Sequence, residues 1–381
     1  MARALIAEGH EVTVVCGVVD TASTGVETSN KRATRGEVDG IQVIQLNFPY
    51  SNKHSLAKRA RNFLRYSLAA TRLSLTSSYD VLFATSTPLT AAIPGIVVRR
   101  LRRSKAIVFE VRDVWPDLPI ALGGLNSRLL VAALRRLERG AYNSADRTIG
   151  LAPGICALID ERTTRDSPPA ELIPNGCDLE LFTPGGIDSS TTFRAVFTGT
   201  HGVANGLDAC LDSAEVLRSR GRADIELHFI GSGNQKERLI ASAHERKLDN
   251  CKFFDPLPKK ELGVALQQYD AGLMILSDIP EFYYGTSPNK FFDYIASGMP
   301  VVNNYPGWLA DLSAEYSCGL AVDPGDPTEL ANAIEELADN PDSSAKMAAN
   351  ARQLAEERFA RSDLSAQFVA TLQDVNSGKG N

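Results

Sequence analysis

Short apolar runs rich in β-branched residues alternate with helical stretches along almost the whole chain. This alternation is typical of a parallel β-sheet covered by helices, because parallel strands need crossover connections and are buried on both faces. The sequence therefore predicts the α/β class. The expected strands are Glu11–Gly17, Ile41–Leu46, Val81–Thr85, Ala106–Val111, Arg147–Ala152, Ala170–Pro174, Arg194–Gly199, Ile225–Gly231, Cys251–Asp255, Ala271–Leu276, Pro300–Asn304 and Gly319–Asp323.

The chain divides near a cluster of Gly, Pro, Asp and Ser residues between Asn175 and Ser190. The net charge of −6 changes sign at this break: residues 1–177 carry 23 basic and 16 acidic residues (+7), and residues 178–381 carry 17 and 30 (−13). Such clusters are typical of linkers, and opposite charges indicate different partners. We therefore predict a first domain at residues 1–177 and a second at residues 178–359, each built on one sheet.

The composition excludes several classes of protein. With 44% hydrophobic and 23% charged residues, the chain of 381 residues is ordinary for a globular protein. No apolar run approaches the roughly 18 to 20 residues that span a bilayer, and the N-terminus lacks the regions of a signal peptide, which predicts a cytoplasmic location. The six cysteines are scattered without a C-x-x-C pair, so neither a disulfide framework nor a metal site is expected.

Positive charge concentrates in two segments of the first half, Lys53–Leu73 and Arg99–Lys105. In the first segment, apolar residues recur with helical period while Lys58, Arg59 and Arg65 spread around the rest of the helix. This composition suits an interfacial helix on anionic lipid. A solvated helix packed on its own domain is the simpler alternative. Nucleic acid is not indicated, because no aromatic residues alternate with the basic ones and no reader motif accompanies them.

The segment Glu281–Val302 predicts a helix with an open, positively charged start. Ser287 is a suitable N-cap and Pro288 suits the first helical position. Apolar residues then recur with helical period until Gly298, which stops the helix before a buried strand. The unpaired N–H groups of the first turn, near Lys290, form a ready site for a phosphate or diphosphate.

Two side chains of this helix add to the predicted site. Lys290 supplies a point charge, and Asp293, about one turn further along, can accept hydrogen bonds from sugar or ribose hydroxyls. The alternative is an ordinary capped helix whose lysine and aspartate are simply solvated, since caps of this kind are common.

The first ten residues predict the last turns of a helix, with Gly9 as its stop, leading directly into a strand. An α/β domain usually begins with a strand, a glycine-bearing loop and then such a helix. We therefore expect that the chain is truncated or that its start codon is misplaced.

Taken together, eight segments resemble glycosyltransferase family 4 of the GT-B enzymes, especially bacterial transferases of the L-fucosamine transferase type that build O-antigen or capsule. The segments follow family order over nearly the whole chain. They are Phe109–Asp117 (FEVRDVWPD), Ala121–Leu125 (ALGGL), Leu137–Asp146 (LERGAYNSAD), Ile173–Phe182 (IPNGCDLELF), Phe197–Asp208 (FTGTHGVANGLD), Phe229–Leu239 (FIGSGNQKERL), Ser287–Val302 (SPNKFFDYIASGMPVV) and Asn304–Trp308 (NYPGW).

The resemblance implies two Rossmann-like, doubly wound domains that face a central cleft, with the C-terminal helix from about residue 360 to 381 crossing back to the first domain. It implies transfer of a sugar from a nucleotide donor to an acceptor hydroxyl with retention at the anomeric carbon, in general without a metal or other cofactor. The first strand and the glycine loop of the family are absent from this sequence.

The resemblance places the donor in the second domain. The residues at the helix start would meet the diphosphate and are Ser287, Pro288, Asn289 and Lys290. Asp293 takes the position of the family's second Glu, which binds ribose. The family's first Glu falls on Gly285, so Glu281 and the adjacent Tyr283 and Tyr284 are the nearest substitutes for that sugar contact.

Further donor contacts are expected at turns that follow strands. Many family members carry an Arg and a Lys where this chain has Thr200 and Asn205, so Lys290 and the N–H groups of Gly199 to Gly202 would supply the positive charge. His201 could donate a hydrogen bond to the donor or could simply satisfy a loop carbonyl. The remaining expected contacts are backbone positions: Gly199, Thr200, Gly202, Gly231 and Gly233 near the nucleotide, and Pro256 and Leu257, by family position, at the base edge.

Arg112 and Asp113 follow the expected strand Ala106–Val111, at the edge where α/β proteins bind ligands. We assign Asp113 to an acceptor or donor-sugar contact and Arg112 to the charge of the leaving phosphate or of the acceptor, as the catalytic pair. Alternatively, the two residues form structural ion pairs with Asp117 or Glu138. In this family the leaving phosphate oxygen is commonly drawn as assisting attack, so catalysis would be positioning and charge stabilisation.

The sequence thus favours a retaining glycosyltransferase that moves an N-acetylated deoxyhexosamine from a UDP donor to a lipid-linked glycan in O-antigen, capsule or exopolysaccharide synthesis, at the inner face of the plasma membrane. The nucleotide and the sugar rest on the resemblance alone. One alternative is a sugar-nucleotide epimerase on the same fold, although no acidic and histidine constellation accompanies the five histidines. Another is an inactive homologue that acts as an assembly partner, which the absent first strand motivates.

Overall fold

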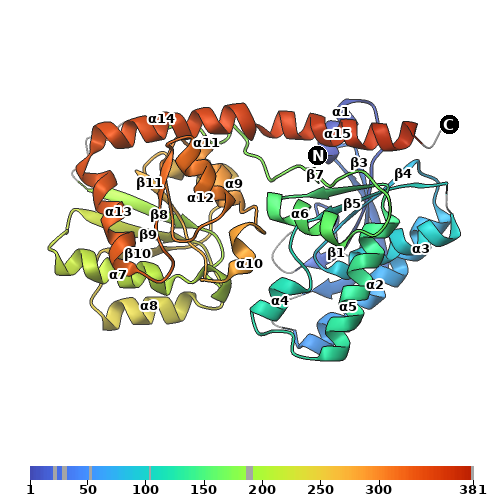
Figure 1. Ribbon diagram of the computed structural model, residues 1–381, viewed down its shortest axis with the longest axis horizontal. Helices are drawn as coiled ribbons and strands as arrows, with labels where there is room; N and C mark the ends of the chain where they lie inside the picture. The colour runs from blue at the N-terminus through green and yellow to red at the C-terminus, as the bar shows by residue number, and fades with distance from the viewer. Residues whose placement is uncertain (20–23, 28–31, 51–53, 103, 186–191, 379–381) are drawn as a thin grey trace. The chain divides into compact units, whose positions relative to one another are not determined.

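The computed structural model describes residues 1–19, 24–27, 32–50, 54–102, 104–185 and 192–378 (Figure 1). The chain forms two compact units: unit 1 comprises Met1–Ile173 with Ser362–Asn381, and unit 2 comprises Pro174–Arg361. The expected boundary after residue 177 lies four residues beyond this division. Residues 186–190 of the expected linker lie outside the described residues.

The described residues of unit 1 form two sheets. The first consists of β1 (Thr13–Val19), β3 (Ile41–Tyr50) and β2 (Ala33–Val38) in that order, with β1 parallel and β2 antiparallel to β3. The second consists of the parallel strands β4 (Val81–Thr85), β5 (Ala106–Val111), β6 (Arg147–Gly150) and β7 (Glu171–Leu172). The helices are α1 (Ala2–Ala7), α2 (Leu56–Thr76), the 3-10 helix η1 (Leu89–Ala92), α3 (Ile93–Leu101), α4 (Asp117–Ala121), α5 (Arg128–Ser144), α6 (Pro153–Arg162) and α15 (Arg361–Ser377).

Strand β2 is absent from the strands that the apolar pattern predicts. Its residues alternate between exposed and half-buried, so no apolar run marks it. The signal lies instead in the turn to β3: Asp39 and Gly40 have φ of 52° and 77°. Positive φ at both central residues is the requirement of a two-residue hairpin turn of type I′, and Asp-Gly is a preferred pair for it.

The two sheets of unit 1 differ in burial. Every residue of β5 is buried, and Val108 and Ile149 pack against Phe368 and Leu372 of α15. Strands β1 and β4 each form an edge, and their described apolar residues are only half-buried. This arrangement differs from the single doubly wound sheet that the resemblance implies for the first domain.

The part of unit 2 that the structure describes forms one six-stranded parallel sheet in the order β10-β9-β8-β11-β12-β13. The strands are β8 (Phe193–Thr198), β9 (Ile225–Ile230), β10 (Cys251–Phe254), β11 (Ala271–Met274), β12 (Val301–Asn303) and β13 (Gly319–Ala321). The helices are the 3-10 helix η2 (Val203–Asn205), α7 (Asp208–Ser219), α8 (Lys236–Glu245), α9 (Lys259–Leu266), α10 (Pro280–Tyr283), α11 (Asn289–Ala296), α12 (Trp308–Glu315), α13 (Pro327–Asp339) and α14 (Pro341–Arg358).

The strand order of unit 2 reverses between β8 and β11 (Figure 1). From β8 the chain proceeds outward through β9 to β10, and then returns to the other side of β8 to build β11, β12 and β13. This reversal is the topological switch point of a doubly wound sheet, where the loops after the two central strands diverge and leave a crevice for ligands. All six strands expected in the second half are confirmed, because buried parallel strands read as apolar runs.

Two predictions concern helix ends. The C-terminal helix expected from about residue 360 begins at Arg361 as α15, after α14 ends at Arg358, and Ala360 between them bridges to Cys177. The expected stop at Gly298 is also confirmed, with φ of 62° directly after the C-cap of α11. Among the described residues, no helix is both long enough and apolar enough to cross a membrane.

Candidate functional site

The predicted donor residues of unit 2 lie at one edge of its sheet. Gly199–Gly202 follow β8, Gly231–Gly233 follow β9, Pro256 and Leu257 follow β10, and the segment leading to α11 follows β11. Because these strands are parallel, their carboxyl ends meet at the same edge, and the turns after β8 and β11 flank the switch point. The topology therefore collects these segments where a doubly wound sheet binds its ligand.

Lys290 is a basic residue at this edge of the sheet. Its Nζ donates a hydrogen bond to Asn205 Oδ1 at 2.8 Å and lies 4.0 Å from the centroid of the Phe197 ring. Asn205 in turn donates to the Thr200 carbonyl at 2.7 Å, so the amide is oriented to accept from the lysine. A β-carbon placed on Gly199 would lie 3.8 Å from Lys290 Cε, which brings the turn after β8 against the start of α11.

Burial lowers the pKa of Lys290 to about 7. The Nζ contacts an amide oxygen and an aromatic ring, which stabilise an ammonium less than a carboxylate does. Among the described residues, no carboxylate lies within ion-pair distance of this Nζ. A bound anion would therefore supply the negative charge that the lysine lacks.

The start of α11 differs from the prediction. The N-cap is Pro288, which has no side-chain acceptor, and the helix begins at Asn289. Ser287 is not the cap, because its Oγ accepts a hydrogen bond from the Asn175 N–H at 3.0 Å while Asn175 Nδ2 donates to the Ser287 carbonyl at 2.6 Å. The serine thus fixes a neighbouring loop, and the first N–H groups of α11 are left without a side-chain cap.

Asp293 is a buried acceptor one turn from Lys290. Its side chain is almost fully buried, and Oδ1 accepts no hydrogen bond from the described residues. The neighbouring cation is Lys259, whose Nζ lies 3.8 Å from Oδ1 but only 2.7 Å from Asp178. Burial raises the pKa of Asp293 to about 6. A ligand hydroxyl that donates to Oδ1 would satisfy it.

The turn after β8 contradicts the expectation that its N–H groups hold the diphosphate. Three of them are already used: Gly199 donates to Ile230 O, His201 to Ser232 O and Gly202 to Thr200 O. The glycines after β9 allow the turn after β9 to pack closely against the turn after β8. A β-carbon on Gly231 would lie 1.8 Å from Gly199 O, and one on Gly233 would lie 2.2 Å from His201 O. Both glycines are thus required for contact between the two turns, whatever the ligand does.

His201 is completely buried beneath these turns. Its ring makes edge contacts with Phe229 and Phe253, and neither ring nitrogen has a hydrogen-bond partner among the described residues. Burial, together with the charges of Lys236 and Lys290, lowers the pKa of His201 to about 4, so the ring is neutral at pH 7. The ring therefore packs against aromatic side chains. It donates no hydrogen bond to a described loop carbonyl, and it is not exposed at the surface of the site.

The other predicted donor contacts are exposed. Pro256 and Leu257 lie on the surface after β10, and Glu281 lies on the surface in the first turn of α10. The two tyrosines proposed as substitutes for the missing Glu are engaged elsewhere, because Tyr283 donates to Asp278 and Tyr284 donates to Asp311 at 3.1 Å. These positions stay predictions by location alone.

Three residues of this region carry no sequence signal strong enough to predict their roles. They are Asn205, which holds Lys290, Lys259, which approaches Asp293, and Asn175, which binds Ser287. Each comes from a different loop, so only the folded chain brings it to its partner.

In unit 1, Arg112 and Asp113 follow β5 at the carboxyl edge of the second sheet. The Arg112 N–H donates to Ser86 Oγ at 2.9 Å, and Thr87 Oγ1 donates to Asp113 at 2.8 Å. Thr87 has φ of 85°, an outlier for a β-branched residue that costs about 1–3 kcal/mol. Such strain is typical of loops at functional sites, and Thr87 is the residue that binds Asp113.

The alternative ion pairs of Arg112 and Asp113 do not form. Asp117 and Glu138 instead bind Arg135 and Arg162, with Arg162 at 2.7 Å from Asp117 and 2.5 Å from Glu138. Glu138 is fully buried, and burial raises its pKa despite the two arginines. This cluster joins α4, α5 and α6 and leaves the guanidinium of Arg112 exposed, 3.7 Å from Glu110.

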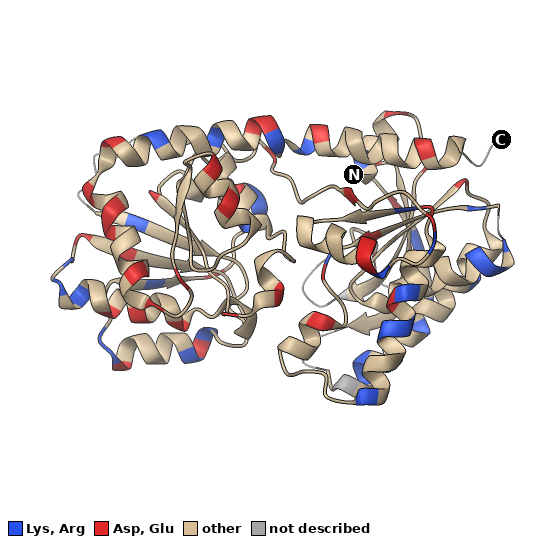
Figure 2. Ribbon diagram, viewed as in Figure 1, with Lys and Arg blue, Asp and Glu red and all other residues tan. Residues whose placement is uncertain are grey.

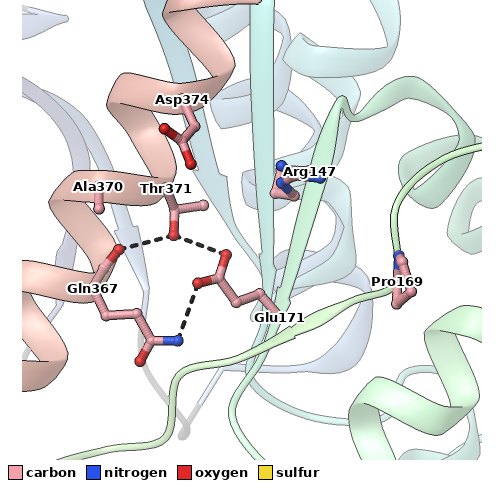
Figure 3. Close-up of a pocket in the computed structure, with 7 residues that line it drawn as sticks. All are labelled: Arg147, Pro169, Glu171, Gln367, Ala370, Thr371 and Asp374. Carbon is pink, nitrogen blue, oxygen red and sulfur yellow. Dashed lines mark hydrogen bonds between the residues drawn. The ribbon is translucent and has the colours of Figure 1, made fainter.

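Neither a metal centre nor the cavity of unit 1 coincides with the predicted site in the described residues. Among the described residues, no group of three or more His, Cys, Asp or Glu side chains is arranged to hold a metal ion. A cavity of about 340 Å³ lies in unit 1, away from every predicted site residue (Figure 3). It lies between α15 and the strand pair β6 and β7, where Glu171 accepts hydrogen bonds from Gln367 and Thr371.

Comparisons with known proteins give the family. The chain matches "Glycosyl transferase 4-like domain" over residues 1–176 and "Glycosyl transferases group 1" over residues 189–354. It therefore belongs to the family 4 glycosyltransferases of the GT-B fold. It is 25% identical over 307 residues to the probable glycosyltransferase WbjE of Pseudomonas aeruginosa, covering 76% of this chain and 74% of that protein. It is also 25% identical to a D-inositol 3-phosphate glycosyltransferase of Corynebacterium urealyticum, covering 93% of this chain and 86% of that one.

Solved structures share the fold at lower identity. Sucrose-phosphate synthase from Thermosynechococcus elongatus has a TM-score of 0.76 at 16% identity, over 99% of this chain and 92% of that one. Anabaena HepE in complex with UDP has a TM-score of 0.66 at 18% identity, over 88% and 87%. The Escherichia coli trehalose-6-phosphate protein bound with UDP-2-fluoro glucose has a TM-score of 0.73 at 12% identity, over 98% and 94%. The predicted α/β class and GT-B fold are confirmed.

Proposed function

We propose that this glycosyltransferase binds a nucleoside diphosphate sugar at the carboxyl edge of the unit 2 sheet and transfers the sugar with retention. The observation that carries the proposal is Lys290, a cation at the open start of α11 that has no carboxylate partner in the described part of the chain. Asp293 lies one turn along the same helix with an unsatisfied oxygen. Together they offer positive charge for a diphosphate and an acceptor for ribose hydroxyls at the spacing of one helical turn.

The chemistry follows from charge. When the glycosidic bond to the diphosphate breaks, negative charge develops on the leaving phosphate oxygen. The ammonium of Lys290 and the N–H groups of Asn289 and Lys290 would stabilise that charge from positions fixed before the reaction. These groups provide positive charge without a metal. Retention then requires only that the acceptor hydroxyl attack from the face that the diphosphate leaves, and no side-chain nucleophile is needed.

The donor is proposed to be a UDP-sugar. HepE was solved with UDP and with UDP-glucose, and the trehalose-6-phosphate protein with a UDP-sugar analogue. The sugar is proposed to be an N-acetylated deoxyhexosamine and the acceptor a lipid-linked glycan of O-antigen, capsule or exopolysaccharide synthesis, on the resemblance to L-fucosamine transferases. Arg112 and Asp113 are proposed to contact the acceptor or the reacting sugar. No observation of the structure favours an epimerase or an inactive partner.

The test is calorimetric titration of the full chain with UDP. Lys290→Ala and Asp293→Ala are each expected to weaken UDP binding at least tenfold, because each removes a charged contact to the ligand. Lys260→Ala is the matched control, since Lys260 is an exposed lysine on α9 of the same unit. Unchanged affinity in both site variants would refute the site. Incubation of the wild type with candidate UDP-sugars and no acceptor distinguishes the epimerase, which would release an altered sugar product.

A further inference from the structure

Helices α2, α3 and α5 of unit 1 expose positive charge and no negative charge. The stretches that contain them, residues 54–79, 89–105 and 122–144, hold a single acidic residue, Glu138. That glutamate is fully buried and bound to Arg162. The described basic residues that are exposed on these stretches are Lys58, Arg61, Arg65, Arg72, Arg100, Arg102, Arg128, Arg136 and Arg139.

Large leucines protrude among these cations. Leu64 and Leu68 on α2 are 52% and 60% exposed, Leu101 at the end of α3 is 67% exposed, and Leu129 on α5 is 86% exposed. Single exposed leucines are ordinary, but here they share helical faces with arginines. Arg61, Leu64, Arg65 and Leu68 are spaced by three or four residues, and so they lie on one side of α2.

The three helices belong to one layer. Helix α3 packs against both α2 and α5. Figure 2 shows Lys and Arg along α5 and at the end of α3, in the same part of unit 1. The cations and the leucines therefore form one surface, the outward faces of α2, α3 and α5, which we call the basic-leucine surface.

We propose that the basic-leucine surface docks unit 1 on an anionic lipid bilayer. Its arginines would bind lipid headgroups, and Leu64, Leu68 and Leu129 would enter the boundary between headgroups and acyl chains. Nucleic acid would use the positive charge but would leave the leucines without a role. The surface includes most of the two predicted basic segments, although Lys53 and Arg103 lie outside the described residues, and it adds the start of α5, which the sequence does not single out.

This inference extends the proposed function, because a lipid-linked acceptor would lie in the same bilayer, but it depends on different residues. Its test is sedimentation of the full chain with vesicles of phosphatidylcholine alone or with one-quarter phosphatidylglycerol, at 0.1 M salt. The wild type is expected to bind only the anionic vesicles. The variant Arg61→Gln/Arg65→Gln/Arg72→Gln is expected to lose on the order of 100-fold in partitioning, because each basic residue near an anionic surface contributes about fivefold.

A second variant separates lipid from other anions. Leu64→Ser/Leu68→Ser/Leu129→Ser keeps every charge and is expected to bind anionic vesicles at least tenfold more weakly while binding duplex DNA no differently from the wild type. The matched control, Lys252→Gln/Lys260→Gln/Lys346→Gln, removes three exposed charges from unit 2 and is expected to bind vesicles like the wild type. Equal binding to both vesicle types, or wild-type vesicle binding by either unit 1 variant, would overturn the proposal. UDP titration of each variant, expected unchanged, keeps this result separate from the donor site.

Discussion

The half-buried position of Lys290 makes donor binding depend on pH. In the free protein, burial holds the pKa of Lys290 at about 7, so the side chain loses its proton over the range in which an exposed lysine stays charged. A diphosphate bound beside Nζ would keep the lysine protonated, because the opposite charge stabilises the ammonium. Binding above pH 7 must therefore take up a proton, and the affinity must fall as the pH rises.

The size of the change in UDP affinity follows from the protonation of Lys290 in the free protein and in the complex. If the complex holds Lys290 fully protonated up to pH 9, the dissociation constant for UDP is expected to rise roughly 50-fold between pH 7 and pH 9, close to tenfold per unit at the upper end. At pH 8, about 0.9 proton is expected to be taken up for each UDP bound. UDP itself contributes little to this slope, because a terminal phosphate with a pKa near 6 is already ionised.

Both quantities come from one set of calorimetric titrations. The slope is read from dissociation constants between pH 7 and pH 9, and the proton uptake from the dependence of the binding enthalpy on the ionisation enthalpy of the buffer. Lys290→Met is expected to bind UDP weakly, with little slope and no uptake, whereas Lys260→Met should retain both. Tight UDP binding by the wild type with a flat pH profile and no proton uptake would refute the role of Lys290.

Three further predictions concern stability and reactivity. Burial raises the pKa of Asp293 from 3.8 to about 6, so the native state holds a proton that the unfolded state has lost between these pH values, and the protein loses stability as the pH rises through them. In urea unfolding, Asp293→Asn is therefore expected to be more stable than the wild type by up to about 3 kcal/mol at pH 7.5 and to match it near pH 4. The same variant is expected to bind UDP less tightly. Gly231→Ala would place a β-carbon against Gly199 O and is expected to destabilise unit 2 by on the order of 3 kcal/mol. In the control Gly202→Ala the added β-carbon would have its nearest contact at an ordinary 3.5 Å, and the loss of stability should be far smaller. Equal urea midpoints for the two variants would contradict the packing of the turns. Burial raises the pKa of all six thiols, so alkylation by iodoacetamide at pH 7.5 is expected to be slow in the native protein and fast in urea. Rapid alkylation of any cysteine in the native protein would contradict this prediction.

The sequence predicts most of the fold because most strands are parallel and buried. Such strands appear as continuous apolar runs, and every strand of unit 2 overlaps an expected run, with β8 beginning one residue earlier than expected. Strand β2 shows no such apolar run, because it is half-exposed and pairs antiparallel. The Asp39-Gly40 turn is the sequence feature that indicates it. The separation of unit 1 into two sheets depends on which strands are neighbours, and apolar patterns do not report neighbours.

The candidate site is predictable where it depends on one helix. The spacing of Lys290 and Asp293 along α11 follows from the sequence, since both lie on a single continuous element. Interactions between segments that are distant in the chain cannot be predicted from the sequence in this way. Ser287 has the chemistry of an N-cap, but Asn175, 112 positions away, takes its hydroxyl. His201 has the chemistry of a ligand donor, but the aromatic side chains around it are set by the packing of two turns.

The central claim is that the start of α11 holds the diphosphate of the donor. The most direct measurement is an experimental structure of the protein with UDP. The expected complex has a diphosphate oxygen within about 3.2 Å of Lys290 Nζ, a second on the first N–H groups of α11, and a ribose hydroxyl on Asp293 Oδ1. A complex in which UDP binds away from Lys290, or in which both residues keep the contacts of the free protein, would contradict the account.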